Sequence, residues 1–161
     1  MVVREADGSD VDAIEAVARA SWETDYPAIL SRETAHEGVE EWYAADRLAA
    51  EVESDDALVP VADGEDGVIG FAHAVTEEAG GTILRLYVAP EHRREGVGGD
   101  LLEHTREALA ERGAERVRAM VLAENEPGNA FYRRHGFELA DESETVIAGT
   151  SYRENVYVAG R

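Results

Sequence analysis

The sequence predicts a single mixed α/β domain over residues 1–161, with elements in the order β-α-α-β-β-β-α-β-α-β-β. A chain of 161 residues suits one domain with one sizeable core. Short apolar runs typical of strands alternate with stretches in which apolar residues recur at helical spacing. No linker, internal repeat or low-complexity segment divides the chain. A strand-helix-strand succession over 83–122 makes two of the strands parallel, so we expect a mixed sheet.

The N-terminal part combines one short strand with two helices. Residues 2–4 form the strand, and Ser9 is the expected N-cap of the first helix, with Asp12 as its capping-box partner. The apolar stripe of this helix consists of Val11, Ile14, Val17 and Ala18. The helix should end within 22–27, because the proline at the end of that range disfavours helix at the residue before it. An acidic, alanine-rich stretch over 31–49 predicts the second helix.

Three strands follow as an antiparallel meander. They cover 57–62, 68–75 and 83–88, and acidic turns that contain glycine separate them. After a glycine-rich turn, the spacing of apolar residues predicts a third helix that ends near Gly113. The next apolar run, 117–122, is a strand that should lie parallel to 83–88, because a helix connects the two.

The C-terminal part adds a short helix and a hairpin. Asn125 is the expected N-cap of this helix, and Gly136 ends it. The hairpin has strands over 145–148 and 152–158, with the turn at Gly149.

The chain is strongly acidic and contains no lysine. Asp and Glu number 35 against 15 basic residues, all of them arginine, for a formal net charge of -20. Such a surface attracts cationic substrates and repels nucleic acid, or it reflects salt adaptation, since molar salt screens self-repulsion. The acidic residues are spread along the whole chain. This spread favours salt adaptation, so we expect a halophilic protein with no nucleic-acid partner.

Several function classes are excluded by what the sequence lacks. The chain has no cysteine, which excludes disulfides, thiolate metal sites and a cysteine nucleophile. No cluster of His and carboxylate residues has metal-ligand spacing, and no apolar run approaches a membrane span. The N-terminus lacks the apolar stretch of a signal peptide. We therefore expect a cytoplasmic protein that binds no metal and no membrane.

A glycine-rich turn ahead of the third helix is the clearest candidate site. Gly96, Gly98 and Gly99 remove Cβ atoms where the backbone turns tightly and a ligand would approach closely. The first helical turn offers unpaired N–H groups and the positive dipole end, and Arg93 and Arg94 add positive charge. These features predict an anion site, most often for phosphate, although such a turn also serves as a tight connection alone. The pattern is neither a P-loop nor a Rossmann fingerprint.

Two motifs lie on these elements in order. The first is Leu86-Tyr87-Val88-Ala89-Pro90 followed by Arg93-x-x-Gly96-x-Gly98. The second is Asn125-x-x-Gly128-x-x-Phe131-Tyr132-x-x-x-Gly136-Phe137. With the order of elements, they resemble the GNAT superfamily of acyl-CoA-dependent N-acyltransferases over nearly the whole chain. The resemblance implies acetyl transfer from acetyl-CoA to a primary amine by direct attack in a ternary complex, and a central sheet splayed at the cofactor site. The alternative is a non-catalytic acyl-CoA-binding sensor or scaffold, because a fold does not fix a function.

The resemblance also implies roles for individual residues. The CoA pyrophosphate would bind the loop and helix start, formed by Arg93, Arg94, Glu95, Gly96, Val97, Gly98 and Gly99. The pantetheine arm would contact Asn125 and lie beside Leu86, Tyr87 and Val88. Tyr132 would donate a proton to the leaving thiolate, which suits a phenol that is protonated at neutral pH. The alternative for Tyr132 is a packed aromatic beside Phe131 and Phe137. Arg94 stands where many members have glycine, which is tolerable if its φ is negative.

Three residues are candidates for the amine side of the site. We expect a small-molecule or peptide amine near Trp22, Tyr26 and His73, although aromatic residues at helical spacing are more often core. The general base would come from His73, Glu77 or Glu78, and His73 is otherwise a strand residue that faces solvent or core. Members of the family often dimerise through their C-terminal strands, so a homodimer remains open.

Overall fold

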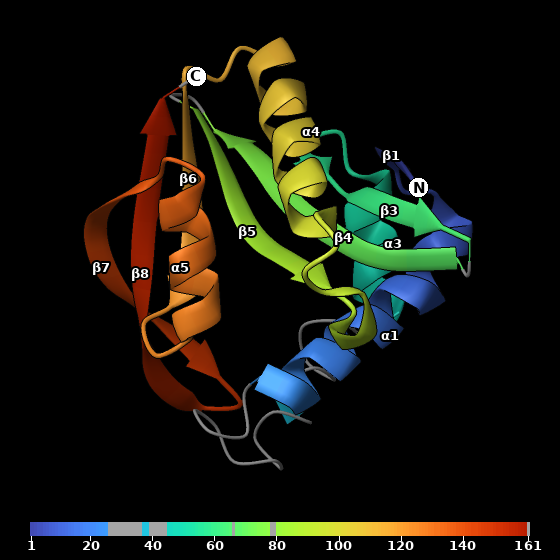
Figure 1. The fold of residues 1–161 in the computed structure, drawn as a ribbon, viewed down its shortest axis with the longest axis horizontal. Helices are drawn as coiled ribbons and strands as arrows, with labels where there is room; N and C mark the ends of the chain where they lie inside the picture. The colour runs from blue at the N-terminus through green and yellow to red at the C-terminus, as the bar shows by residue number, and fades with distance from the viewer. Residues whose placement is uncertain (26–36, 39–44, 66, 78–79, 161) are drawn as a thin grey trace.

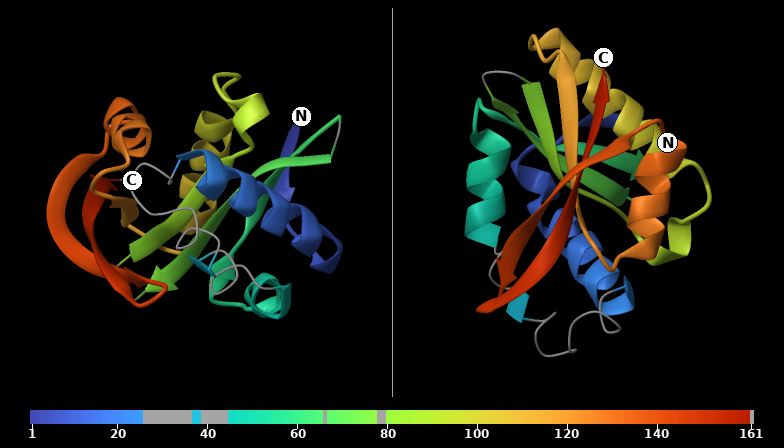
Figure 2. Two further views of the ribbon diagram at one scale, coloured as in Figure 1. Left: turned by 90° about the horizontal axis from the view of Figure 1, so that it is seen from below. Right: turned by 90° about the vertical axis from the view of Figure 1, so that its left-hand side faces the viewer.

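The computed structural model describes residues 1–25, 37–38, 45–65, 67–77 and 80–160. Its centre is an eight-stranded mixed sheet in the order β1-β3-β4-β5-β6-β8-β7, with β2 paired to β4. The strands are β1 Val2–Glu5, β2 Ala57–Leu58, β3 Pro60–Gly64, β4 Gly67–Glu77, β5 Gly80–Val88, β6 Arg116–Leu122, β7 Glu138–Ile147 and β8 Thr150–Gly160. One face of the sheet carries α1 Val11–Asp25 and α3 Ala45–Glu53, and the other carries α4 Val97–Glu111 and α5 Glu126–Arg134 (Figure 1, Figure 2). The predicted mixed α/β class and order of elements are confirmed.

The N-cap of the first helix differs from the prediction. Asp7, not Ser9, is the cap residue, and a short 3-10 turn over Gly8–Asp10 leads into α1. The Asp7 carboxylate accepts the backbone N–H of Ser9 at 2.8 Å, and the Asp10 carboxylate accepts the backbone N–H of Asp7 at 2.9 Å. The choice of Ser9 and Asp12 was therefore wrong, because an Asx cap two residues earlier satisfies the same free N–H groups.

The second helix is described only in part. Most of the predicted range 31–49 lies outside the described residues, as does Tyr26. The described α3 starts at Ala45 and continues to Glu53, beyond the predicted end.

The meander is confirmed, with a break in its first strand. β3, β4 and β5 pair antiparallel, as expected. The predicted strand 57–62 is divided at Val59 into β2 and β3, both of which pair with β4. Pro60 begins β3, and a proline cannot donate to a sheet ladder, so it favours a strand start over a strand interior.

The sheet opens at its centre, where two parallel strands diverge. β5 and β6 are in parallel register only over Gly81–Ile83 and Val117–Ala119. Beyond this short contact, β5 follows β4 to Val88, whereas β6 follows β8 to Leu122, and the two strands separate (Figure 1). The predicted parallel pair and the predicted splay are therefore both present.

The C-terminal hairpin is much longer than predicted. β7 and β8 pair antiparallel from Glu138↔Val158 to Ile147↔Thr150, with a bulge between Leu139 and Asp141. The prediction of a strand over 145–148 found only the end of β7. Most of β7 is an exposed edge strand with four carboxylates, so its sequence lacks the apolar alternation that marks a half-buried strand.

The sheet separates the core into layers that meet at the opening. One buried cluster packs α1 and α3 on the sheet and includes Ile14, Trp22, Phe71, Leu122 and Ile147. A second packs α4 and α5 on the opposite face and includes Ile83, Leu102, Leu109, Tyr132 and Tyr157. The predicted helical stripe of α1 is buried as expected. Members of both clusters border the space where β5 and β6 separate.

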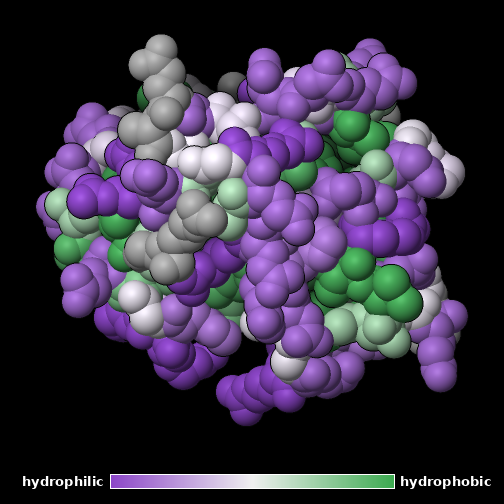
Figure 3. Space-filling model, turned by 90° about the horizontal axis from the view of Figure 1, so that it is seen from above, coloured by the Kyte–Doolittle hydropathy of each residue, from purple (hydrophilic) through white to green (hydrophobic). Residues whose placement is uncertain are grey.

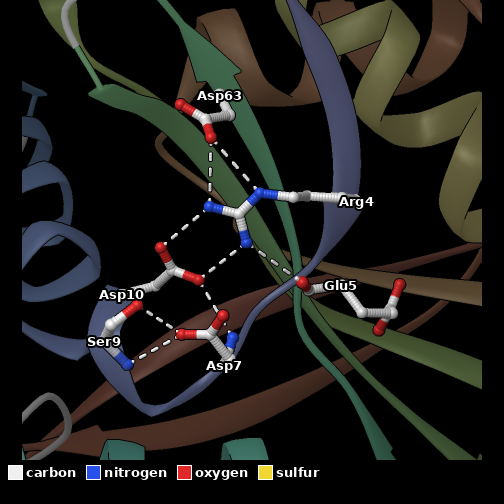
Figure 4. Close-up of polar contacts among 6 residues, drawn as sticks. All are labelled: Arg4, Glu5, Asp7, Ser9, Asp10 and Asp63. Atoms are coloured by element: carbon white, nitrogen blue, oxygen red, sulfur yellow. Dashed lines mark hydrogen bonds and ion pairs between the residues drawn. The ribbon is translucent and has the colours of Figure 1, made fainter.

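A polar network fixes the start of the chain against the sheet. The Arg4 guanidinium donates to both oxygens of Asp10, at 2.8 and 3.0 Å, and to Asp63 on β3 at 3.1 Å (Figure 4). Asp10 is 6% exposed and also accepts the backbone N–H of Asp7. The hydrogen bonds from Arg4, together with that N–H, hold the pKa of Asp10 below its ordinary value. Arg4 therefore ties β1, the helix cap and β3 together.

Replacing Asp10 by asparagine should lower the free energy of unfolding by about 2 kcal/mol, the range for a charge-assisted hydrogen bond. Because the folded pKa of Asp10 is depressed, its contribution is present above the unfolded value of about 4 and is lost as the pH falls through the folded value. Urea unfolding at pH 7 and pH 3 should show a smaller pH effect in Asp10→Asn than in the wild type. Asp12→Asn, on the exposed side of α1, is the control. Equal stability of Asp10→Asn and Asp12→Asn would show that the network contributes nothing.

The surface is largely hydrophilic. Figure 3 shows hydrophilic side chains over most of the face drawn, with apolar residues in separate small patches. In the described part of the chain, no helix is long and apolar enough to cross a membrane.

Candidate active site

A cavity of about 580 Å³ occupies the place where β5 and β6 separate. Its walls come from β5, the loop before α4, the start of α4, the end of β6, and α5, with contributions from α1, β7 and β8. A volume of this size suits a small-molecule ligand. The cavity therefore lies at the splay that the sequence predicted for the cofactor.

Most of the predicted site residues line this cavity. They are Trp22, Leu86, Tyr87, Val88, Arg93, Arg94, Gly96, Val97, Gly98, Gly99, Asn125 and Tyr132. Glu95 belongs to the same loop but is exposed and outside the wall, with its carboxylate 3.4 Å from His92 Nδ1. His73 is not in the wall, and Tyr26 lies outside the described residues.

The turn before α4 leaves the helix start open. Gly96 is the N-cap residue, with a φ of 83°, and no side chain caps the first turn. The backbone N–H groups of that turn are therefore available to an anion. A Cβ on Gly98 would stand 3.1 Å from Phe131 Cε1, so glycine permits the close approach of α4 and α5 here.

Arg94 differs from the expectation for its backbone. Its φ is +65°, in the left-handed region, whereas the sequence analysis expected a negative φ for a non-glycine residue here. A non-glycine residue in this region carries strain of about 1–2 kcal/mol, which the surrounding turn must offset. In contrast to a glycine, Arg94 places an exposed, positively charged side chain at the cavity wall.

One end of the cavity is basic. Of the six arginine and histidine residues that line the cavity in the described part of the chain, all but Arg85 lie at this end, namely His92, Arg93, Arg94, Arg134 and His135. They gather in a chain whose formal net charge is -20. Guanidinium groups beside an open helix start are suited to a phosphate. The geometry therefore favours an anion site over a tight connection alone; we call this end the basic mouth.

The start of α5 is fixed by two asparagines. Asn125 caps the helix as predicted, and its Oδ1 accepts the backbone N–H of Gly128 at 3.2 Å. A Cβ on Gly128 would lie 2.7 Å from Asn125 Nδ2, so alanine here would displace the cap side chain. Asn129 is 3% exposed and donates to the backbone oxygens of Leu122 and Asn125.

Asn129 also connects α5 to β8. Its Oδ1 accepts from Asn155 Nδ2 at 2.8 Å and from the Tyr157 hydroxyl at 2.6 Å, both on β8. The sequence analysis missed this residue. An asparagine inside a short helix, four residues after its cap, was the available signal, because a buried amide needs several partners.

Tyr132 is both a packed aromatic and a cavity residue. It is 5% exposed and packs edge-on against Phe137 at 5.2 Å, and its ring is stacked with that of Tyr157 at 6.1 Å. It also lines the cavity wall. Burial, and then the nearby Tyr87, raise the pKa of Tyr132 above its ordinary value, so the phenol is protonated at neutral pH.

The far end of the cavity lies on the α1 side of the sheet. Trp22 is 1% exposed and donates its indole N–H to the Tyr87 hydroxyl at 3.0 Å, so it belongs to both the core and the wall. Arg85, Ile147 and Glu154 complete this end, which we call the α1-side end.

His73 is buried next to the cavity. Its Nδ1 lies 2.7 Å from Arg85 Nη1 and 3.5 Å from Glu51 Oε2, and it is 5% exposed. Burial, and then the charge of Arg85, lower its pKa to about 4, so the ring is neutral at neutral pH. Because Nδ1 faces a guanidinium donor, we assign the ring proton to Nε2. Glu77 is exposed at the end of β4, and Glu78 lies outside the described residues.

Glu154 is a wall residue that the sequence analysis did not single out, although it lies on the predicted strand 152–158. It is partly buried on β8, opposite Leu122 in register. Burial raises its pKa, and the positive charge of Arg85 opposes that rise. A single acid among the alternating residues of β8 was the available signal. Among the described residues, no group of three or more His, Asp or Glu side chains is placed to hold a metal ion.

The comparisons with known proteins agree with this geometry. The acetyltransferase (GNAT) domain family matches residues 55–139, just over half of the chain. The chain is 28% identical over 143 residues to the spermidine N(1)-acetyltransferase of Thermoplasma acidophilum, across 86% of this chain and 89% of that protein. It is 30% identical over 95 residues to the ribosomal protein bS18-alanine N-acetyltransferase of Escherichia coli K12, across 59% of this chain and 63% of that protein. The fold is similar to that of PaiA N-acetyltransferase from Thermoplasma acidophilum in complex with coenzyme A, with a TM-score of 0.88, 24% identity, and coverage of 99% of this chain and 98% of that chain.

Proposed function

Because this chain belongs to the GNAT family of acetyltransferases, we propose that its cavity binds acetyl-CoA at the basic mouth and receives an amine at the α1-side end. The reaction is the transfer of an acetyl group from acetyl-CoA to that amine. The observation that carries the arrangement is one continuous cavity that crosses the sheet where β5 and β6 separate. We assign this activity to one domain that spans residues 1–161.

The cofactor placement follows from the chemistry of the walls. The uncapped start of α4, with Arg93 and Arg94 beside it, suits the pyrophosphate. The half of β5 that does not pair with β6 suits the amide-containing pantetheine arm, which can add to a strand edge through backbone hydrogen bonds. Acetyl-CoA supplies the acetyl thioester on which the amine acts.

Two features of the chain shape the chemistry of the transfer. Tyr132 lines the cavity and holds its proton at neutral pH, so it can protonate the leaving thiolate. The chain has no cysteine to form a thioester intermediate, which supports direct attack by the amine in a ternary complex. A module that only binds acyl-CoA is not favoured, because the relatives found are named acetyltransferases.

For the acceptor, we propose an alkyl polyamine with spermidine as the first candidate. The named activity of the Thermoplasma relative supports this choice, since that match extends over most of both chains. A partly buried carboxylate in the wall of the α1-side end, that of Glu154, also suits a cationic amine. We further propose that the acidic surface is a salt adaptation, so the assays belong at both low and molar potassium chloride.

The test measures CoA release by the purified protein with acetyl-CoA and a panel of amines. The panel contains spermidine, putrescine and a peptide that begins with alanine, and mass spectrometry identifies the acetylated product. We expect N-acetylspermidine in equal amount to the released CoA. Release only with the peptide would replace the polyamine by a protein N-terminus. Release no faster than in buffer with every amine, while acetyl-CoA still binds in a calorimetric titration, would overturn the catalytic proposal.

A further inference from the structure

The acidic and basic side chains that line the cavity are distributed unequally between its two ends. The basic mouth carries only arginine and histidine, whereas Arg85 and Glu154 line the α1-side end. Among the described lining residues, Glu154 is the only carboxylate. A carboxylate is the group that an incoming ammonium ion would meet most favourably.

The register of β8 places Glu154 on the α1 face of the sheet. Asn155 and Tyr157 contact Asn129 and therefore face α5. Because side chains alternate along a strand, Glu154 faces the opposite side, where its cross-strand partner Leu122 packs with α1. Tyr132 on α5 and Glu154 on β8 thus reach one cavity from opposite faces of the sheet.

Arg85 is the charged group that acts on Glu154 within the cavity wall. Burial raises the pKa of Glu154, while Arg85 on β5 lowers it. Behind Arg85 lie His73 on β4, which is neutral at neutral pH, and Glu51 on α3, with Arg47 at 3.7 Å from that carboxylate. Burial also raises the pKa of Glu51, but Glu51 does not line the cavity.

We propose that Glu154 binds the ammonium group of the acceptor and accepts the proton that the amine must lose before it attacks the thioester. The inference rests on the proposed acetyl transfer. It replaces the three candidates for the base that the sequence offered, since the described ones, His73 and Glu77, do not line the cavity.

The protons balance in this scheme. The ammonium gives one proton to Glu154, and the neutral amine attacks the thioester carbonyl to form the C–N bond. The C–S bond breaks, and the thiolate takes the proton of Tyr132. The nitrogen then loses its second proton to the Tyr132 oxygen, which restores the phenol. Glu154 releases its proton to solvent, so one amide, one thiol and one free proton result.

The test compares Glu154→Gln with the wild type across pH, with the amine of the panel that the wild type turns over fastest. At pH 7, we expect kcat/KM to fall by about 100-fold, within the range for loss of a general base. The loss should shrink as the pH approaches about 10, where a growing share of an alkylamine is neutral in solution. Glu154→Asp should recover part of the activity. The affinity for acetyl-CoA should stay within about twofold of the wild type, because Glu154 lies away from the basic mouth.

Glu142→Gln is the matched control, since Glu142 is an exposed carboxylate on the neighbouring strand β7. It should behave as the wild type at every pH. Wild-type kcat/KM in Glu154→Gln, or a loss of the same size at every pH, would overturn the role of Glu154 while leaving acetyl transfer intact. A wild type that acetylates no amine would remove the proposed function and this inference together.

Discussion

Replacing Gly98 by tryptophan should abolish acetyl-CoA binding, with a dissociation constant raised by at least about 100-fold. Even a Cβ at this position would lie 3.1 Å from Phe131 Cε1 and 3.7 Å from Val88 Cγ2. An indole would therefore fill the space between the end of β5 and α5, beside the open N-terminus of α4. Calorimetric titration of acetyl-CoA at molar potassium chloride measures the loss directly.

The control places the same side chain elsewhere on α4. Glu111 ends the helix and is exposed, outside the cavity wall. Glu111→Trp should bind acetyl-CoA as the wild type does, and circular dichroism should show that both variants are folded. Wild-type affinity in Gly98→Trp would contradict the cofactor site at this loop. The proposal that the cavity transfers an acetyl group from acetyl-CoA would then have no cofactor site to rest on.

Local chemistry explains which parts of the fold could be predicted from the sequence. The Asn125 cap depends on a few neighbouring residues, as does the left-handed glycine that follows α5, so the sequence displayed both. The length of β7 depends instead on backbone pairing with β8, which its polar sequence does not reveal. The same limit applies to Arg94, because the turn around it imposes its positive φ.

The candidate site shows the same division. Motif residues such as Gly98 and Tyr132 line the cavity because they lie on helices α4 and α5, whose positions in the order of elements the sequence predicted. The amine side was harder to predict, because the face that a strand residue occupies depends on register. β4 and β5 change register between His73 and Ala74, and a shift of one residue reverses the side on which later residues lie. Glu154 lies within the predicted strand 152–158, but the sequence alone did not show which face of the sheet its side chain occupies.

Replacing Tyr132 by phenylalanine should lower kcat by about 100-fold or more and leave acetyl-CoA affinity unchanged. The ring would still pack against Phe137 and Tyr157, so only the proton donor would be lost. The wild type requires the protonated phenol, and activity would fall as the pH rises through its pKa. Since burial raises that pKa, the fall should come above the ordinary tyrosine value of about 10. Steady-state kinetics between pH 7 and 10 should therefore show no alkaline fall in wild-type kcat from Tyr132, and an acetyl-CoA titration measures the affinity separately.

Tyr157→Phe distinguishes chemistry from packing in the same aromatic cluster. The Tyr157 hydroxyl donates to Asn129 at 2.6 Å and accepts from Arg133 at 3.2 Å, but Tyr157 does not line the cavity. Its loss should lower the free energy of unfolding by about 1–2 kcal/mol and change kcat by less than about threefold. If Tyr132→Phe kept wild-type kcat, the thiolate would receive its proton from another source. Tyr157 does not line the cavity, so its hydroxyl has no place in the proposed proton transfer. If both variants lost kcat equally, the loss in Tyr132→Phe would therefore reflect disturbed packing of the aromatic cluster.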